Sequence, residues 1–252
     1  MLEDYLEKSS RRGVYSNLIQ INLNSISDQL NQYTNYFDKI ILCDVLEHLN
    51  DPMNTLKQLS NCLKENGEIL IDIPNIAHGS IKYKLLINEF QYQDYGLLDK
   101  THIKFFTPFS LIDALSENNF FIENMDFVIN HPNDGLFPIN YDDFNEDIIK
   151  FIEEDKVSYI FQIFAVAKKS NLKKIDLIKH NNLFKKFNNL EDRINEYLPN
   201  FLDNKFSGIE NESNEIYKLK NEIQLMKNSN SWKITSPLRA FFKFIKKIFA
   251  RK

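Results

Sequence analysis

The alternation of apolar and polar positions divides the first 170 residues into short strands and helices. Short apolar runs rich in β-branched and aromatic side chains predict strands. They occupy residues 18–23, 39–43, 68–73, 121–129 and 159–168. A helical pattern lies between 39–43 and 68–73, and a strand, helix and strand in this order predict a right-handed parallel crossover. The chain is therefore expected to fold as an α/β domain.

Capping signals set the limits of the expected helices. Asp51-Pro52 combines an N-cap residue with proline at the first helical position. The apolar face of this helix is then made by Met53, Leu56, Leu59 and Leu63. Asn66-Gly67 is expected to end it, and Thr107-Pro108 is expected to start another helix. Shorter helices are expected at 2–12 and 25–33.

The character of the sequence changes near residue 170, after which Lys, Asn and Glu dominate. We therefore expect a domain at residues 1–170, a linker or helical segment at 171–208, and two further helices within 209–252. The first of these helices has Ile209, Ile216 and Ile223 at one heptad position. Such a short coiled-coil-like seam predicts a weak homo-oligomer.

The last segment, 238–252, has the pattern of a basic amphipathic helix whose charged residues are all Lys or Arg. Its apolar face is made by Leu238, Phe241, Phe242, Ile245, Ile248 and Phe249. Such a helix is suited to the inner face of an anionic membrane. The alternative is a helix that docks on the domain with its lysines in water.

Composition excludes several classes of function. A net charge of −4 gives no overall nucleic-acid footprint. Two cysteines cannot form a disulfide framework, and the charged N-terminal segment is not a signal peptide, so a reducing cytoplasm is expected. No apolar run approaches the length of a membrane-spanning helix. The five histidines lack metal-ligand spacing, so no metal site is predicted.

Several short motifs follow one another between Phe37 and Phe121. They are Phe37-Asp38, Asp44-Val-Leu-Glu-His-Leu49, Asp51-Pro52, Asn66-Gly67, Ile73-Pro-Asn75 and Gly96-Leu-Leu-Asp-Lys-Thr-His-Ile-Lys-Phe-Phe-Thr107. In this order and at this spacing the motifs resemble class I S-adenosylmethionine-dependent methyltransferases. The resemblance is to the branch that accompanies glycosyltransferases in bacterial surface-polysaccharide gene sets.

This resemblance implies a Rossmann-like methyltransferase sheet that is incomplete. Residues 1–168 would begin at the helix after the family's second strand, without the first two strands, the Gly-rich cofactor loop and the ribose-binding acid. None of the six glycines forms a Gly-x-Gly motif. Two missing strands leave a gap of about 14 Å. Residues 18–23 would then either pair directly with 39–43 or be left as an unsatisfied edge.

S-adenosylmethionine is the cofactor that the resemblance implies, although the chain lacks the loop that would hold it. Cofactor contacts would come from Asn22 and Leu23 at the end of the family's third strand, and from Cys43, Asp44 and His48 after its fourth. Asn22 stands where the family often has an acidic residue near the adenine. Its side-chain carbonyl could accept the same hydrogen bond.

Methyl transfer to a hydroxyl needs a group that takes up the acceptor's proton, and histidine suits this task. His48 lies just past a strand end, where α/β sheets place their ligands. The alternative is that Glu47 and His48 merely open the next helix. His102 has Asp99 placed to orient its imidazole, and the alternative is a structural loop in which Asp99 caps the turn.

Asn75 and His78 follow the next strand at the same edge and are candidate substrate contacts. Pro74-Asn75 is also an ordinary turn sequence. Asp72, at the end of that strand, is either a site carboxylate or a solvated one.

Two functions of different classes remain open. The first is methyl transfer to a sugar hydroxyl in surface-polysaccharide biosynthesis. The segment 228–239 supports it, because this segment is similar to a tail motif of many polysaccharide-assembly glycosyltransferases. The expected partners are a glycan-precursor acceptor and those glycosyltransferases, in the cytoplasm or at the inner face of the plasma membrane. The second function is a non-catalytic methyltransferase remnant that binds a glycan or a partner at the membrane.

Overall fold

The computed structural model describes residues 13, 15–26, 28–133, 139–170 and 189–198. The helix expected at 2–12, the coiled-coil-like seam and the basic C-terminal helix lie outside these residues. Most of the expected linker at 171–208 does so too, apart from a helical segment at 189–198. No helix in the described part of the chain is both long enough and apolar enough to cross a membrane.

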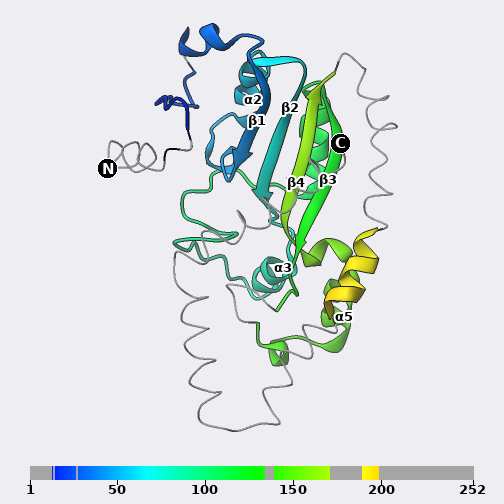
Figure 1. The fold of residues 1–252 in the computed structure, drawn as a ribbon. Coiled ribbons are helices and arrows are strands. Elements are labelled where there is room, and N and C mark those ends of the chain that lie inside the picture. The colour runs from blue at the N-terminus through cyan, green and yellow to red at the C-terminus, as the bar shows by residue number, and fades with distance from the viewer. Residues whose placement is uncertain (1–12, 14, 27, 134–138, 171–188, 199–252) are drawn as a thin grey trace.

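The described residues form a four-stranded sheet in the order β1-β2-β4-β3 (Figure 1). β1 (Phe37–Cys43) pairs in parallel with β2 (Leu63–Pro74). β4 (Ile160–Lys169) runs antiparallel to β2 on one side and to β3 (Phe120–Ile129) on the other. The strands expected at 39–43, 68–73, 121–129 and 159–168 are therefore confirmed, as is the α/β class.

The main core lies between one face of this sheet and the helices α2 (Pro52–Ser60) and α4 (Pro108–Glu117). Both starts follow the expected signals, since the Asp51 side chain accepts from the backbone N–H of Asn54 and Thr107 forms a capping box with Ser110. Segment 189–198 adds Leu190 and Ile194 to the same core, and Leu198 packs against it. In Figure 1, α2 lies behind the sheet.

The end of α2 differs from the prediction, because the helix stops at Ser60 and not at Asn66-Gly67. The carbonyl of Cys62 accepts the backbone N–H groups of Tyr36 and Phe37, both at 2.9 Å, so sheet pairing begins where the helix was expected to continue. Leu63 consequently belongs to β2. Asn66-Gly67 lies inside that strand, next to an irregularity in its register with β1.

The prediction of a strand at 18–23 was wrong, since these residues have no regular secondary structure. Leu18 and Ile19 are exposed, while Leu23 and Ile26 pack against the α2 side of the core. The hydroxyl of Thr55 on α2 also donates to the carbonyl of Leu23, which holds the segment at this helix. Within the described residues β1 is thus an edge strand, and Ile41 on it is 52% exposed. Direct pairing of 18–23 with 39–43 was therefore also wrong.

The expected helix at 25–33 is replaced by the shorter 3-10 helix η1 (Asp28–Tyr33). Two helices were not predicted, and both lie beyond the carboxyl end of β2 in Figure 1: α3 (Gly79–Leu86) and α5 (Glu146–Glu154). α3 is capped by His78, which is not a common N-cap residue. The remaining short elements are η2 (Leu46–His48), η3 (Tyr141–Asp143) and η4 (Lys156–Tyr159).

The packing of α2 predicts a large effect of truncation at its buried face. Leu56 is fully buried in the main core, so Leu56→Ala should lower the free energy of unfolding by about 2–5 kcal/mol. Ile41→Ala is the matched control, because the side chain of Ile41 is 52% exposed on β1. This substitution should lower the free energy of unfolding by less than about 1 kcal/mol. Urea denaturation measures both. Equal losses in the two variants would contradict the placement of α2.

Candidate functional site

The carboxyl ends of β1 and β2 bring three acidic side chains toward one edge of the sheet. Cys43, the last residue of β1, is in register with Asp72 of β2. Asp44 then turns the chain out of the sheet with a φ of 49°, and its N–H still donates to the carbonyl of Asp72 at 3.0 Å. The short helix η2 follows and carries Glu47 and His48.

Burial governs the electrostatics of these acids. Glu47 is fully buried, and burial together with the charge of Asp44 raises its pKa to about 8. Burial likewise raises the pKa of Asp72 to about 9. Because Asp72 is fully buried, it is not a solvated carboxylate, which was one of the two alternatives that the sequence left open. The pKa of Asp44 is also raised by burial, although Gln162 donates to its Oδ1 at 2.7 Å.

Hydrogen bonding leaves several of these oxygens without a partner. Neither carboxylate oxygen of Glu47 has a hydrogen-bond partner among the described residues, and Oδ1 of Asp72 has none either. Oδ2 of Asp72 accepts from Sγ of Cys43 at 3.6 Å. Burial raises the pKa of the Cys43 thiol, which makes it a poor nucleophile.

His48 and His102 are brought together although they lie far apart in the sequence. Their rings are 4.8 Å apart at an interplanar angle of 65°. Nδ1 of His48 lies 3.1 Å from the carbonyl oxygen of Thr101, and Nδ1 of His102 lies 3.3 Å from that of Leu97. Because a carbonyl only accepts, Nδ1 carries the proton in each neutral ring and Nε2 carries the lone pair. Burial lowers the pKa of His102.

Asp99 acts on this pair differently from the expectation. It makes no hydrogen bond to the imidazole of His102, which is oriented by the Leu97 carbonyl, although its charge acts to raise the pKa of His102 against the larger effect of burial. Its carboxylate instead accepts from the backbone N–H of Thr101 at 2.8 Å and from the Thr101 hydroxyl at 2.6 Å. Asp99 therefore shapes the turn that supports His48, which is close to the alternative of a structural cap.

Asn22 is held in a local turn, and Leu23 is held by α2. The side chain of Asn22 accepts from the N–H of Asn24 at 3.0 Å, and the carbonyl of Leu23 accepts from the Thr55 hydroxyl at 3.0 Å. Asn24 in turn accepts from the N–H of Asn50 at 2.8 Å. These contacts give both residues a structural role, and their contact with a cofactor stays a prediction.

Asn75 and His78 are fully buried, and their polar atoms are used within the protein. Asn75 donates to the carbonyls of Val157 and Ile160 at 3.1 and 2.7 Å and accepts from the N–H of Ala77. His78 caps α3, and burial lowers its pKa to about 3. In this conformation neither residue offers a polar atom to a substrate.

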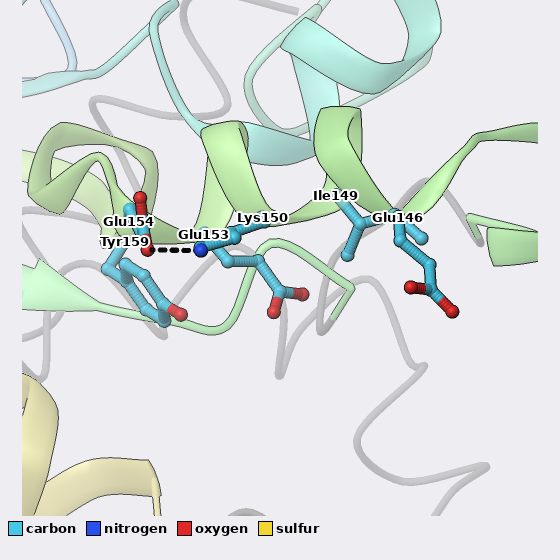
Figure 2. A pocket seen from close by; sticks show the side chains of 6 residues that line it. All are labelled: Glu146, Ile149, Lys150, Glu153, Glu154 and Tyr159. Atoms are coloured by element: carbon cyan, nitrogen blue, oxygen red, sulfur yellow. Dashed lines mark ion pairs between the residues drawn. The ribbon is translucent and has the colours of Figure 1, made fainter.

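A separate hollow lies on α5, where the sequence predicted no site. Figure 2 shows the side chains that line this space of about 420 Å³. They are Glu146, Ile149, Lys150, Glu153, Glu154 and Tyr159. Lys150 and Glu154 pair at 3.8 Å, and Glu153 accepts from the hydroxyl of Tyr141 at 2.6 Å. Most of the charged side chains that line this hollow therefore already have an ion-pair or hydrogen-bond partner within the protein.

Sequence reasoning missed Glu47 as a site residue and treated it as part of a helix start. The signal that could have found it is the run Asp44-Val-Leu-Glu-His48 directly after a buried strand. It also missed Thr101 and Gln162, because their contacts join segments that lie far apart in the sequence.

The contacts of Asn75 predict a structural role that can be measured. Asn75→Ala should lower the free energy of unfolding by at least about 2 kcal/mol, since it leaves buried backbone groups unpaired. Asn54→Ala, on the exposed side of α2, is the control and should change stability little. An unchanged thermal midpoint for Asn75→Ala would show that these hydrogen bonds do not hold the loop.

The raised pKa of Asp72 predicts how stability depends on pH. Between about pH 4 and pH 9 the folded protein holds a proton that the unfolded chain releases, so stability falls as pH rises through this window. One such group contributes a slope of up to about 1.4 kcal/mol per pH unit. Asp72→Asn should make the fall between pH 5 and pH 9 shallower in urea titrations. An identical slope in the variant would contradict the assignment.

Residues 7–124 match the family model described as a methyltransferase domain. No curated protein matches the chain.

Among solved structures, a SAM-dependent methyltransferase from Archaeoglobus fulgidus shows 20% identity and a TM-score of 0.40 over 62% of this chain and 69% of that one. A putative methyltransferase from Bacillus halodurans C-125 shows 11% identity and a TM-score of 0.40 over 67% of this chain and 80% of that one. A possible histamine N-methyltransferase from Thermotoga maritima shows 14% identity and a TM-score of 0.42 over 65% and 68%. The residues that match the methyltransferase-domain model, 7–124, include η2 and the turn of His102.

Proposed function

We propose that this chain supplies the acceptor side of an S-adenosylmethionine-dependent methyl-transfer site. The observation that carries the proposal is the meeting of Glu47, His48 and His102 at the carboxyl end of β1, inside the region that matches a methyltransferase domain. Open α/β sheets bind ligands outside the carboxyl ends of their parallel strands. The polar cluster therefore lies where an acceptor would be held.

The chemistry required of these residues is limited. S-adenosylmethionine supplies an activated methyl group when it is bound, so the protein needs only to align the acceptor and remove its proton. Nε2 of His48 is the accessible lone pair for this, because His48 is only half-buried while His102 is buried. Thr101 keeps the ring of His48 in place through Nδ1.

The described residues offer a poor fit to the methionine and ribose portions of S-adenosylmethionine. The sequence contains no Gly-x-Gly motif to bring backbone close to the methionine and ribose portions. Gly67 packs against Leu63 and Gly79 against Pro132, so neither leaves room for a ligand. This misfit favours a second candidate function, in which the domain is a non-catalytic module that binds a glycan or a partner.

The acceptor that we propose is a sugar hydroxyl of a surface-polysaccharide precursor. The tail sequence 228–239 supports this choice through its similarity to tails of polysaccharide-assembly glycosyltransferases, which would be partners in the same pathway. The basic amphipathic sequence 238–252 supports peripheral contact with an anionic membrane at its cytoplasmic face.

Calorimetric titration of this chain with S-adenosylmethionine separates the two functions. We expect weak saturable heat in the millimolar range, because each missing donor costs about 1–3 kcal/mol. Asp44→Ala should weaken the binding further, whereas Asp94→Ala, at an exposed ion pair with Lys100, is the control. If millimolar ligand produces no heat, the methyl-transfer proposal fails and the binding module is favoured.

A further inference from the structure

Glu47, His48 and His102 form a cluster whose chemistry goes beyond proton transfer. One ligand atom from each side chain lies within 4.8 Å of the other two, which distinguishes this group among the described residues. We propose that these three side chains hold a divalent transition-metal cation. The spacing of residues along the chain did not predict a metal site, because the third ligand, His102, comes from a separate turn.

The two imidazoles share a feature of histidines that bind metals. In metal sites a coordinating histidine donates its other ring N–H to a carbonyl or carboxylate, which fixes the tautomer and the ring plane. Here the carbonyls of Thr101 and Leu97 occupy that position at Nδ1 of His48 and His102. The lone pair of each ring is therefore on Nε2, and Nε2 of His102 lies 4.0 Å from Oε1 of Glu47.

The carboxylate of Glu47 supplies an independent reason to expect a cation. It is fully buried, and neither of its oxygens has a hydrogen-bond partner among the described residues. Burying a carboxyl group without a partner is costly even when the group is neutral. Two ligands that are each about 2.1 Å from a tetrahedral ion lie about 3.4 Å apart. The 4.0 Å separation from His102 thus closes with a small side-chain adjustment.

The backbone holds the two parts of the cluster in register. The carbonyl of Glu47 accepts the N–H groups of Ile103 and Lys104 at 2.9 and 3.0 Å. These bonds tie η2 to the residues directly after His102. The ligands are therefore positioned by main-chain contacts and do not depend on a flexible side chain alone.

Ligand type and number indicate which cation fits. Two imidazoles and one carboxylate suit Zn²⁺, Fe²⁺ or Co²⁺, whereas Mg²⁺ prefers oxygen ligands. Three protein ligands leave a position open for water or a substrate hydroxyl, and a bound cation lowers the pKa of such a group. The binding of the cation does not depend on the proposed function. Its catalytic role does rest on the proposed function, since the bound cation would activate the acceptor hydroxyl in place of a free His48.

Titration of the metal-free full chain with Zn²⁺ by calorimetry, and with Co²⁺ by visible absorption, tests the site. We expect one Zn²⁺ per chain, a rise in the thermal midpoint with Zn²⁺, and Co²⁺ bands typical of four-coordination. Mg²⁺ should give none of these effects. If wild-type protein binds neither Zn²⁺ nor Co²⁺, the proposal is overturned.

Variants assign the ion to these three side chains. Glu47→Gln, His48→Gln and His102→Gln should each weaken Zn²⁺ binding by at least about 100-fold. His131→Gln is the matched control, because His131 is as buried as His102 but lies beside Glu153. The affinity of this variant for Zn²⁺ should equal that of the wild-type protein. Circular dichroism checks that each variant is folded, and Glu47→Gln keeps the size of the side chain. Wild-type affinity in all three variants would overturn the site.

The outcome is separable from that of the proposed function. Zn²⁺ binding without S-adenosylmethionine binding would leave the metal site standing and remove the methyl-transfer proposal. Cofactor binding without Zn²⁺ or Co²⁺ binding would do the reverse.

Discussion

The parallel pairing of β1 with β2 determines where the candidate site is built. It places Cys43 beside Asp72 and sends the chain out of both strands at the same edge of the sheet. Asp44 can turn there because its backbone adopts a φ of 49° while its N–H remains bonded to the Asp72 carbonyl. A slip of one residue in β2 would move Asp72 to the opposite face, into the apolar core. The positions of Glu47 and His48 depend on that exit.

Burial of acidic groups is the main energetic cost of this arrangement. Glu47 and Asp72 are both fully buried, and both have oxygens without a hydrogen-bond partner among the described residues. Folded proteins are stable by only a small margin, so such groups are normally neutralised or paired. Perturbed acids of this kind concentrate at functional sites. The same burial that raises their pKa values would strengthen their attraction for a cation.

The members of the candidate site were predictable to different degrees. His48 and His102 could each be singled out, because each belongs to a polar motif near a strand or turn. Their contact could not, since it depends on the turn at Thr101 folding back over η2. The burial of Asn75 and His78 could not be predicted for a related reason, and their contact with a substrate stays a prediction. They do follow a strand end, but α3 and the loop before β4 cover them and use their polar atoms.

The sequence alone determined the four strands of the sheet, the start of α2 at Asp51-Pro52 and the start of α4 at Thr107-Pro108. These features follow from local patterns of apolar side chains and capping groups, which act over a few residues. The tertiary structure decided that residues 18–23 form no strand, that β1 is an edge among the described residues, and that Glu47 faces two histidines. Those outcomes depend on which distant segments compete for the same surface, and no local pattern records that competition.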